Sequence, residues 1–227
     1  MVSIELLKNT VKFSLLVQVI TGIITLNGLF IDLPTKDRPL KTINKLENVV
    51  QLIEAIYYTY IVYTISKLDL DKVVRLRYLD WFFTTPIMLI STIMFMEYKR
   101  RDEIKEEQLD FKEFYSKNKS AISKIVFFNF MMLLFGFLGE TEILDKYLSV
   151  SIGFIFFGLT FREVHKFTKN IDINKKIFTI VIILWGLYGV AAMLEPLEKN
   201  ISYNILDMFS KNFYGLYIYY IMNGLKK

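Results

Sequence analysis

The sequence predicts an all-α membrane protein, a bundle of seven transmembrane helices within a single domain, residues 1–227. The chain is 53% hydrophobic and 16% aromatic, which is more apolar than soluble domains usually are. A helix needs about 20 mostly apolar residues to cross ~30 Å of hydrocarbon. Seven stretches approach that length: Val11–Ile31, Asn48–Ser66, Val73–Met96, Ala121–Gly139, Ile143–Phe161, Lys176–Leu194 and Ile201–Asn223.

Basic residues predict which way these helices run. Most lysines and arginines between the apolar stretches lie in the connections 32–47, 97–120 and 162–175 and in the tail after 223. Positively charged loops stay in the cytoplasm. We therefore expect an extracellular N-terminus and a cytoplasmic C-terminus in a multi-pass integral membrane protein.

The composition also argues against several function classes. The chain has no cysteine, which rules out disulfides and thiolate metal sites, and a lone histidine, His165, cannot form a multi-histidine metal site. The net charge is +5, but the basic residues cluster between apolar stretches. That pattern favours contact with the lipid bilayer over nucleic acid. We expect no metal site, no nucleic-acid partner and no enzymatic activity.

The last apolar stretch contains a lysine and an aspartate. Lys211 lies near its middle, and Asp207 is four residues earlier, so both groups share one helix face about one turn apart. A charge at this depth is costly and usually functional. The pair suits two interpretations equally: a structural ion pair, or a protonated Schiff base on the lysine held by an acid.

The third stretch carries a second polar face. Arg77, Asp80 and Thr84 are spaced so that they share one side of a helix. Asp80 could supply a second negative charge for Lys211, Arg77 could neutralise the excess, and the Thr84 hydroxyl could bond to Asp80. The alternative is an ordinary arginine–aspartate pair that joins two helices.

Two motifs on these stretches resemble one family. The segment "RYLDWFFTTP" looks like the third helix of microbial (type 1) rhodopsins, and "LDMFSKNFYG" looks like their seventh. The resemblance implies all-trans retinal as cofactor, joined to Lys211 as a Schiff base. It implies that Asp80 is the primary counterion and proton acceptor, Asp207 the second counterion, and Arg77 the arginine of the extracellular half-channel.

The resemblance also implies a retinal pocket. The residues that match pocket positions are Trp81, Thr85, Met88, Met132, Gly136, Trp185 and Tyr188. Gly189 stands where the family usually has proline, and Ala192 where a further aromatic residue is common. We therefore expect the ring end of retinal to be less tightly enclosed, or enclosed by another side chain.

The functional assignment depends on two further residues. Ser91 lies eleven residues beyond Asp80, ~16 Å toward the cytoplasm, where outward proton pumps of the family usually have a carboxylic acid. Glu54, in the second stretch, is expected a turn or two below the cytoplasmic end. The short chain, Ser91 and the polar connection "DLPTKDRPLKTINK" resemble rhodopsins of large DNA viruses.

These features favour a light-gated cation channel in which Glu54 belongs to a cytoplasmic constriction and monovalent cations pass. The alternatives are a light-driven outward proton pump that uses Glu54 as its proton donor, and a sensory photoreceptor that signals through a partner. The resemblance further implies a homo-oligomer in the plasma membrane of a host cell.

Overall fold

The computed structural model describes residues 3–65 and 70–226, and within them the chain is helical with no β-strand. The α-helices are α1 (Ile4–Leu26), α2 (Arg38–Thr64), α3 (Leu70–Glu103), α4 (Phe111–Glu140), α5 (Lys146–His165), α6 (Asp172–Ala191), α7 (Pro196–Asp207) and α8 (Phe213–Gly224). Two 3-10 turns, η1 (Asn27–Phe30) and η2 (Thr35–Asp37), lie in the first connection. The segment η3 (Met208–Asn212) is π-helical.

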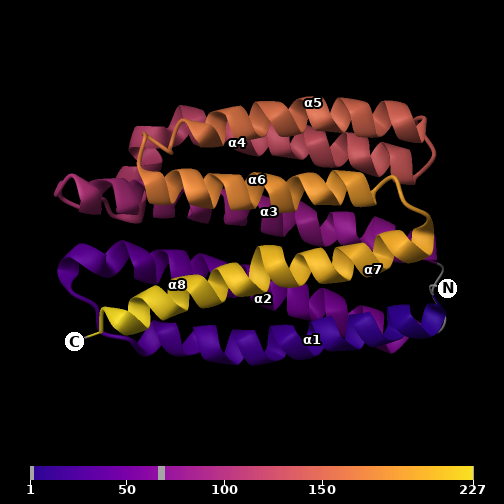
Figure 1. The fold of residues 1–227 in the computed structure, drawn as a ribbon, viewed down its shortest axis with the longest axis horizontal. Coiled ribbons are helices and arrows are strands. Elements are labelled where there is room, and N and C mark those ends of the chain that lie inside the picture. Colours follow the sequence, from indigo (N-terminus) through magenta and orange to yellow (C-terminus); the bar gives the residue numbers. More distant parts are fainter. Residues whose placement is uncertain (1–2, 66–69, 227) are drawn as a thin grey trace.

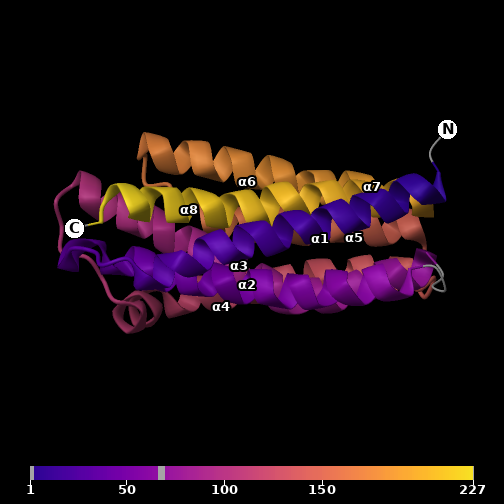
Figure 2. The same cartoon turned by 90° about the horizontal axis from the view of Figure 1, so that it is seen from below.

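In the described ranges these elements form the seven predicted rods, because α7, η3 and α8 follow one another without a break (Figure 1). The all-α, seven-helix fold is therefore confirmed. The start of α1 and the end of α8 lie at opposite ends of the long axis, as an odd number of crossings requires (Figures 1 and 2). The expected end of the second stretch, Ser66, falls outside the described residues.

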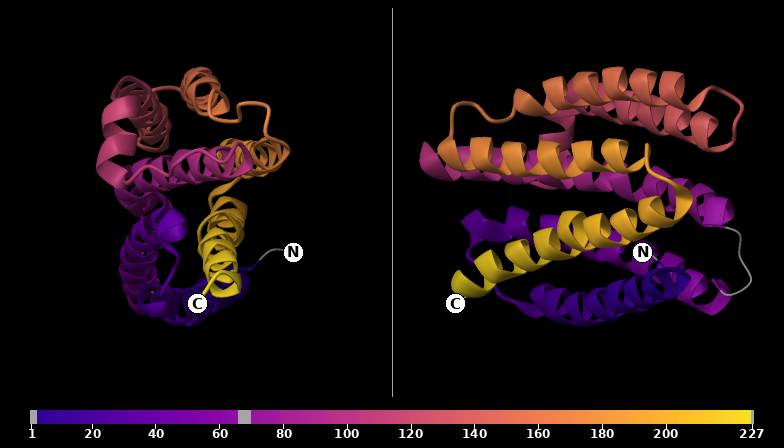
Figure 3. Two further views of the ribbon diagram at one scale, coloured as in Figure 1. Left: turned by 90° about the vertical axis from the view of Figure 1, so that its left-hand side faces the viewer. Right: turned by 45° about the vertical axis from the view of Figure 1, so that its right-hand side comes forward.

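The rods follow one another around the bundle in chain order. Each rod packs against the next, and both α7 and α8 return to pack against α1. Seen from one end, the helices enclose a common interior (Figure 3). The third rod, α3, also contacts α6 and α7. The centre of the bundle is therefore shared by α2, α3 and the seventh rod.

The polar residues of α2 face this interior. By length and composition, five of the described spans could cross a membrane: Ile4–Phe30, α3, α4, α5 and α6. Helix α2 is less apolar because it carries Asn44, Glu47, Gln51 and Glu54, all of which are buried. Packing against other helices keeps these groups away from lipid.

Helices α3 and α4 are longer than expected. Beyond the predicted end at Met96, the Glu97 carboxylate accepts hydrogen bonds from Arg100 and Arg101, three and four residues on, and these pairs support further helical turns. At the start of α4, the Asp110 carboxylate accepts a hydrogen bond from the Glu113 N–H, the usual way to begin a helix.

Candidate functional site

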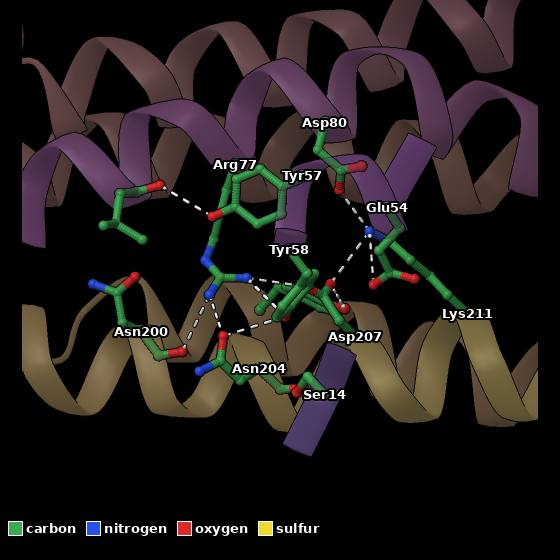
Figure 4. Close-up of polar contacts among 12 residues, drawn as sticks. Ser14, Glu54, Tyr57, Tyr58, Arg77, Asp80, Asn200, Asn204, Asp207 and Lys211 are labelled. Carbon is green, nitrogen blue, oxygen red and sulfur yellow. Dashed lines mark hydrogen bonds and ion pairs between the residues drawn. The ribbon is translucent and has the colours of Figure 1, made fainter. Parts of the chain in front are cut away.

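Lys211 lies at the centre of a cluster of buried acids. Its Nζ atom donates to Asp80 Oδ2 at 2.6 Å, and it lies 3.4 Å from Glu54 Oε1 and 3.5 Å from Asp207 Oδ1 (Figure 4). The four side chains come from α2, α3 and the seventh rod, and each is at most 4% exposed. One amine thus faces three carboxylates in the buried interior of the bundle.

The backbone at Lys211 is unusual, because η3 replaces one α-helical turn by a wider π-helical turn. Segments of this kind are rare and occur often at functional sites. The expected proximity of Asp207 and Lys211 holds, but through this local widening of the helix rather than through regular α-helical spacing.

Arg77 is fully buried and pairs with Asp207 rather than with Asp80. Its Nη1 lies 2.9 Å from Asp207 Oδ2 and donates to the Tyr58 hydroxyl at 3.1 Å. The Tyr58 hydroxyl also donates to the same aspartate oxygen at 2.8 Å, and Arg77 Nη2 donates to Asn204 Oδ1. The arginine therefore ties α3 to α2 and to the seventh rod at one site (Figure 4).

The hydroxyls of Thr84 and Thr85 both donate to backbone carbonyls one helical turn back. The Thr84 hydroxyl does bond to Asp80, and its acceptor there is the backbone carbonyl, at 2.9 Å. The Thr85 hydroxyl donates to the Trp81 carbonyl at 2.7 Å and accepts from Asn129 Nδ2 at 2.8 Å. Within a helix, a threonine hydroxyl commonly donates to the backbone carbonyl one turn back.

The position expected for Glu54 is wrong. The expected place is near the cytoplasmic end, whereas the carboxylate lies beside Lys211 in the middle of the bundle. The carboxylate near Ser91 is instead Glu47, which accepts a hydrogen bond from the Ser91 hydroxyl and is fully buried.

Glu47 is absent from the predicted site residues because it lies one residue before the predicted second stretch. A signal is nevertheless present. Asn44, Glu47, Gln51 and Glu54 recur at intervals of three and four residues. This period marks one continuous polar face on a helix that begins before Asn48.

A cavity adjoins Lys211. All the residues expected to bind the cofactor line it: Trp81, Thr85, Met88, Met132, Gly136, Trp185, Tyr188 and Lys211. Sequence reasoning missed others, including Tyr78, Tyr203 and Ser210. The Trp81 ring meets the rings of Tyr188 and Tyr203 edge to face, with centroids 5.4 and 4.9 Å apart.

Of the two alternatives expected at Gly189, the second holds, because a side chain from a neighbouring helix fills the space. A Cβ atom on Gly189 would lie 2.5 Å from Cζ of Phe154, a residue of α5 that also lines the cavity. At Gly136, a Cβ would lie 2.6 Å from the Tyr78 hydroxyl. Both glycines therefore let an aromatic ring approach the helix backbone closely.

These residues fit retinal. The cavity wall is mostly aromatic and aliphatic, as an apolar polyene requires, and a buried amine lies at the cavity with carboxylates beside it. Within the described residues, no group of histidines, cysteines or acids could hold a metal ion.

Comparison with known proteins gives the family. A family model described as bacteriorhodopsin-like protein matches residues 9–225. The crystal structure of the viral rhodopsin OLPVRII is 26% identical to this chain, with a TM-score of 0.84 over 98% of this chain and 100% of that one. No curated protein sequence matches.

More distant structures share the fold. A blue light-absorbing proteorhodopsin from Med12 is 19% identical with a TM-score of 0.73, covering 96% of each chain. The light-driven proton pump Coccomyxa subellipsoidea rhodopsin is 16% identical, also with a TM-score of 0.73, over 97% of this chain and 98% of that one. Members of the matched family bind retinal through a Schiff base on a lysine. The chain therefore belongs to the bacteriorhodopsin-like family of microbial rhodopsins, multi-pass membrane proteins, and its cofactor is retinal.

Proposed function

We propose that this chain is a light-gated cation channel in which Lys211 carries retinal. When bound, retinal supplies a light-driven change of shape and a positive charge on the Lys211 nitrogen. Asp80 lies 2.6 Å from that nitrogen and would accept its proton, while Asp207 pairs with Arg77. The N-terminus is outside, and the protein works as a homo-oligomer in the plasma membrane of a host cell.

The observation that carries this proposal is a series of buried polar groups on one side of Lys211. No described residue makes a hydrogen bond to either amide atom of Gln18, to Nε2 of Gln51, to Oδ1 of Asn212 or to Oε2 of Glu54. Buried polar atoms without protein partners are normally hydrated. Water beside α1, α2 and the seventh rod would give a hydrophilic path for ions.

Acids along that path favour cations. Glu54 lies beside Lys211, and Glu47 lies seven residues earlier on α2, ~10 Å along the helix. Carboxylates in a pore attract cations and exclude anions. Next to Glu47 on α2, Asn48 Oδ1 accepts a hydrogen bond from the Thr25 hydroxyl at 2.9 Å, which continues the polar lining between α1 and α2.

A proton pump is the second candidate, and one contact favours it. Ser91 cannot donate a proton at neutral pH, but Glu47 reaches the same place from α2 and bonds to it. In a pump, Glu47 would return the proton to Lys211. Glu47 thus takes the role of proton donor that the sequence suggested for Glu54, because Glu54 lies beside Lys211 itself.

Voltage-clamp recording of illuminated cells distinguishes the two functions. A photocurrent that reverses direction when the cation gradient is reversed supports the channel. A current that stays outward at every voltage, independent of the cation gradient, supports the pump and contradicts our proposal. Absorbance changes without any current would indicate a sensory photoreceptor.

Replacing Glu47 by glutamine sharpens the test. In a channel we expect a shifted reversal potential or a smaller conductance, because the pore loses one negative charge. In a pump we expect slow recovery of the visible band after a flash, which added azide restores. The matched control is Glu195→Gln, since Glu195 is an exposed residue before α7 and its loss should change neither quantity.

A further inference from the structure

The cavity at Lys211 has a thin wall between α5 and α6. We call this part of the wall the window; it is formed by Gly153, Phe154 and Gly189, all of which line the cavity. Phe154 is also 41% exposed on the outer surface of the bundle. A single side chain that faces both the cavity and the outside thus separates the cofactor site from the bilayer.

The packing of the Phe154 ring lets it move. The ring lies against the bare backbone of Gly189, where any other residue would place a Cβ within 2.5 Å of it. Its nearest aromatic neighbour is Phe157, at 5.8 Å between centroids. A phenylalanine ring makes no hydrogen bonds, so the window is closed only by weak apolar contacts, each of which costs little to break.

Both ends of the bundle are closed more firmly. At one end, the Lys199 amine contacts the Glu140 carboxylate at 2.9 Å, and beyond it lies the Arg77–Asp207 pair. At that end too, the Lys146 amine donates to two carbonyls that follow α6. The other end is filled by a packed apolar cluster that includes Leu40, Phe95 and Met222. Retinal is apolar and dissolves in lipid, so the bundle ends are unfavourable routes to Lys211.

We propose that retinal reaches Lys211 sideways from the bilayer, through the window between α5 and α6 that the Phe154 ring closes against Gly189. The ring swings outward, the polyene passes between the two helices, and the ring returns to cover it. This inference requires only that the chain binds retinal, and it holds whether the protein is a channel, a pump or a sensor.

The test measures the rate of retinal uptake. The retinal-free full chain in lipid vesicles is mixed with all-trans retinal, and the rise of the visible band is followed over time. We expect Phe154→Ala to speed uptake roughly tenfold, which corresponds to ~1.4 kcal/mol off the barrier. Phe13→Ala is the matched control, because Phe13 is 56% exposed on α1, away from the window, and its loss should leave the rate unchanged.

A second variant keeps the test decisive if Phe154→Ala does not fold. Phe154→Trp retains an aromatic ring but makes the moving group larger, and we expect it to slow the rise of the visible band, measured as a fraction of that variant's own final amplitude. The proposal is wrong if a folded Phe154 variant takes up retinal at the rate of the unaltered chain. It is also wrong if Phe13→Ala changes the rate as much as the Phe154 variants do.

Discussion

Replacing Lys211 by alanine will abolish the visible absorption band that all-trans retinal forms with this chain. Lys211 is the lysine whose amine lies at the cavity, with Asp80, Glu54 and Asp207 within 3.5 Å of it. Without a primary amine there, no covalent link to the aldehyde can form. The measurement is an absorbance spectrum of the purified variant after retinal is added.

The control is the other strongly buried lysine among the described residues. Lys199 is 4% exposed but pairs with Glu140, away from the cavity lining. Lys199→Met should keep the visible band, although its removal leaves Glu140 without its partner and so lowers thermal stability. A persistent band in Lys211→Ala would overturn the assignment of the cofactor site.

Replacing Arg77 by glutamine will destabilise the protein by about 3–5 kcal/mol, the usual cost of removing one partner of a buried ion pair. Arg77 is 0% exposed, and without it Lys211, 3.5 Å away, would be the remaining ion-pair partner of Asp207. The measurement is thermal unfolding in detergent or lipid, followed by the loss of helical circular dichroism.

A double-mutant cycle separates this pairing from general disturbance of the core. In Arg77→Gln/Asp207→Asn neither member of the pair is charged, so neither is left as an unpaired buried charge, and Lys211 still has Asp80 and Glu54 beside it. We expect the double variant to be less destabilised than the sum of the two single variants. Strict additivity would mean that the 2.9 Å contact contributes no coupling energy.

Motifs on single helices are predictable from sequence, and contacts between helices are less so. Arg77, Asp80 and Thr84 share a helix, so their spacing alone determines their common face. The same reasoning identifies Lys211 and Asp207. The partner of Arg77, however, depends on how α3 is oriented about its own axis relative to the seventh rod. No spacing within α3 determines that orientation.

The depth of the acidic residues on α2 is likewise not predictable from the pattern of that helix alone. Hydropathy predicts the start of the second helix at Asn48, but α2 begins at Arg38, ten residues earlier. The helix start is set by the turn at Asp37, and the register of α2 is set by its packing against α1 and α3. An apolar stretch indicates which part of a helix lies in the hydrocarbon. It does not indicate how far the helix extends or which residue lies beside Lys211.

The π-helical turn has a consequence for comparing this chain with others. A π turn holds one more residue than an α turn, so η3 acts like a single inserted amino acid within the seventh rod. Against a homologue whose helix is regular there, a correct alignment needs a one-residue gap inside Met208–Asn212. An ungapped alignment would match either Asp207 or the residues of α8 to the wrong neighbours, however well the two helices superpose.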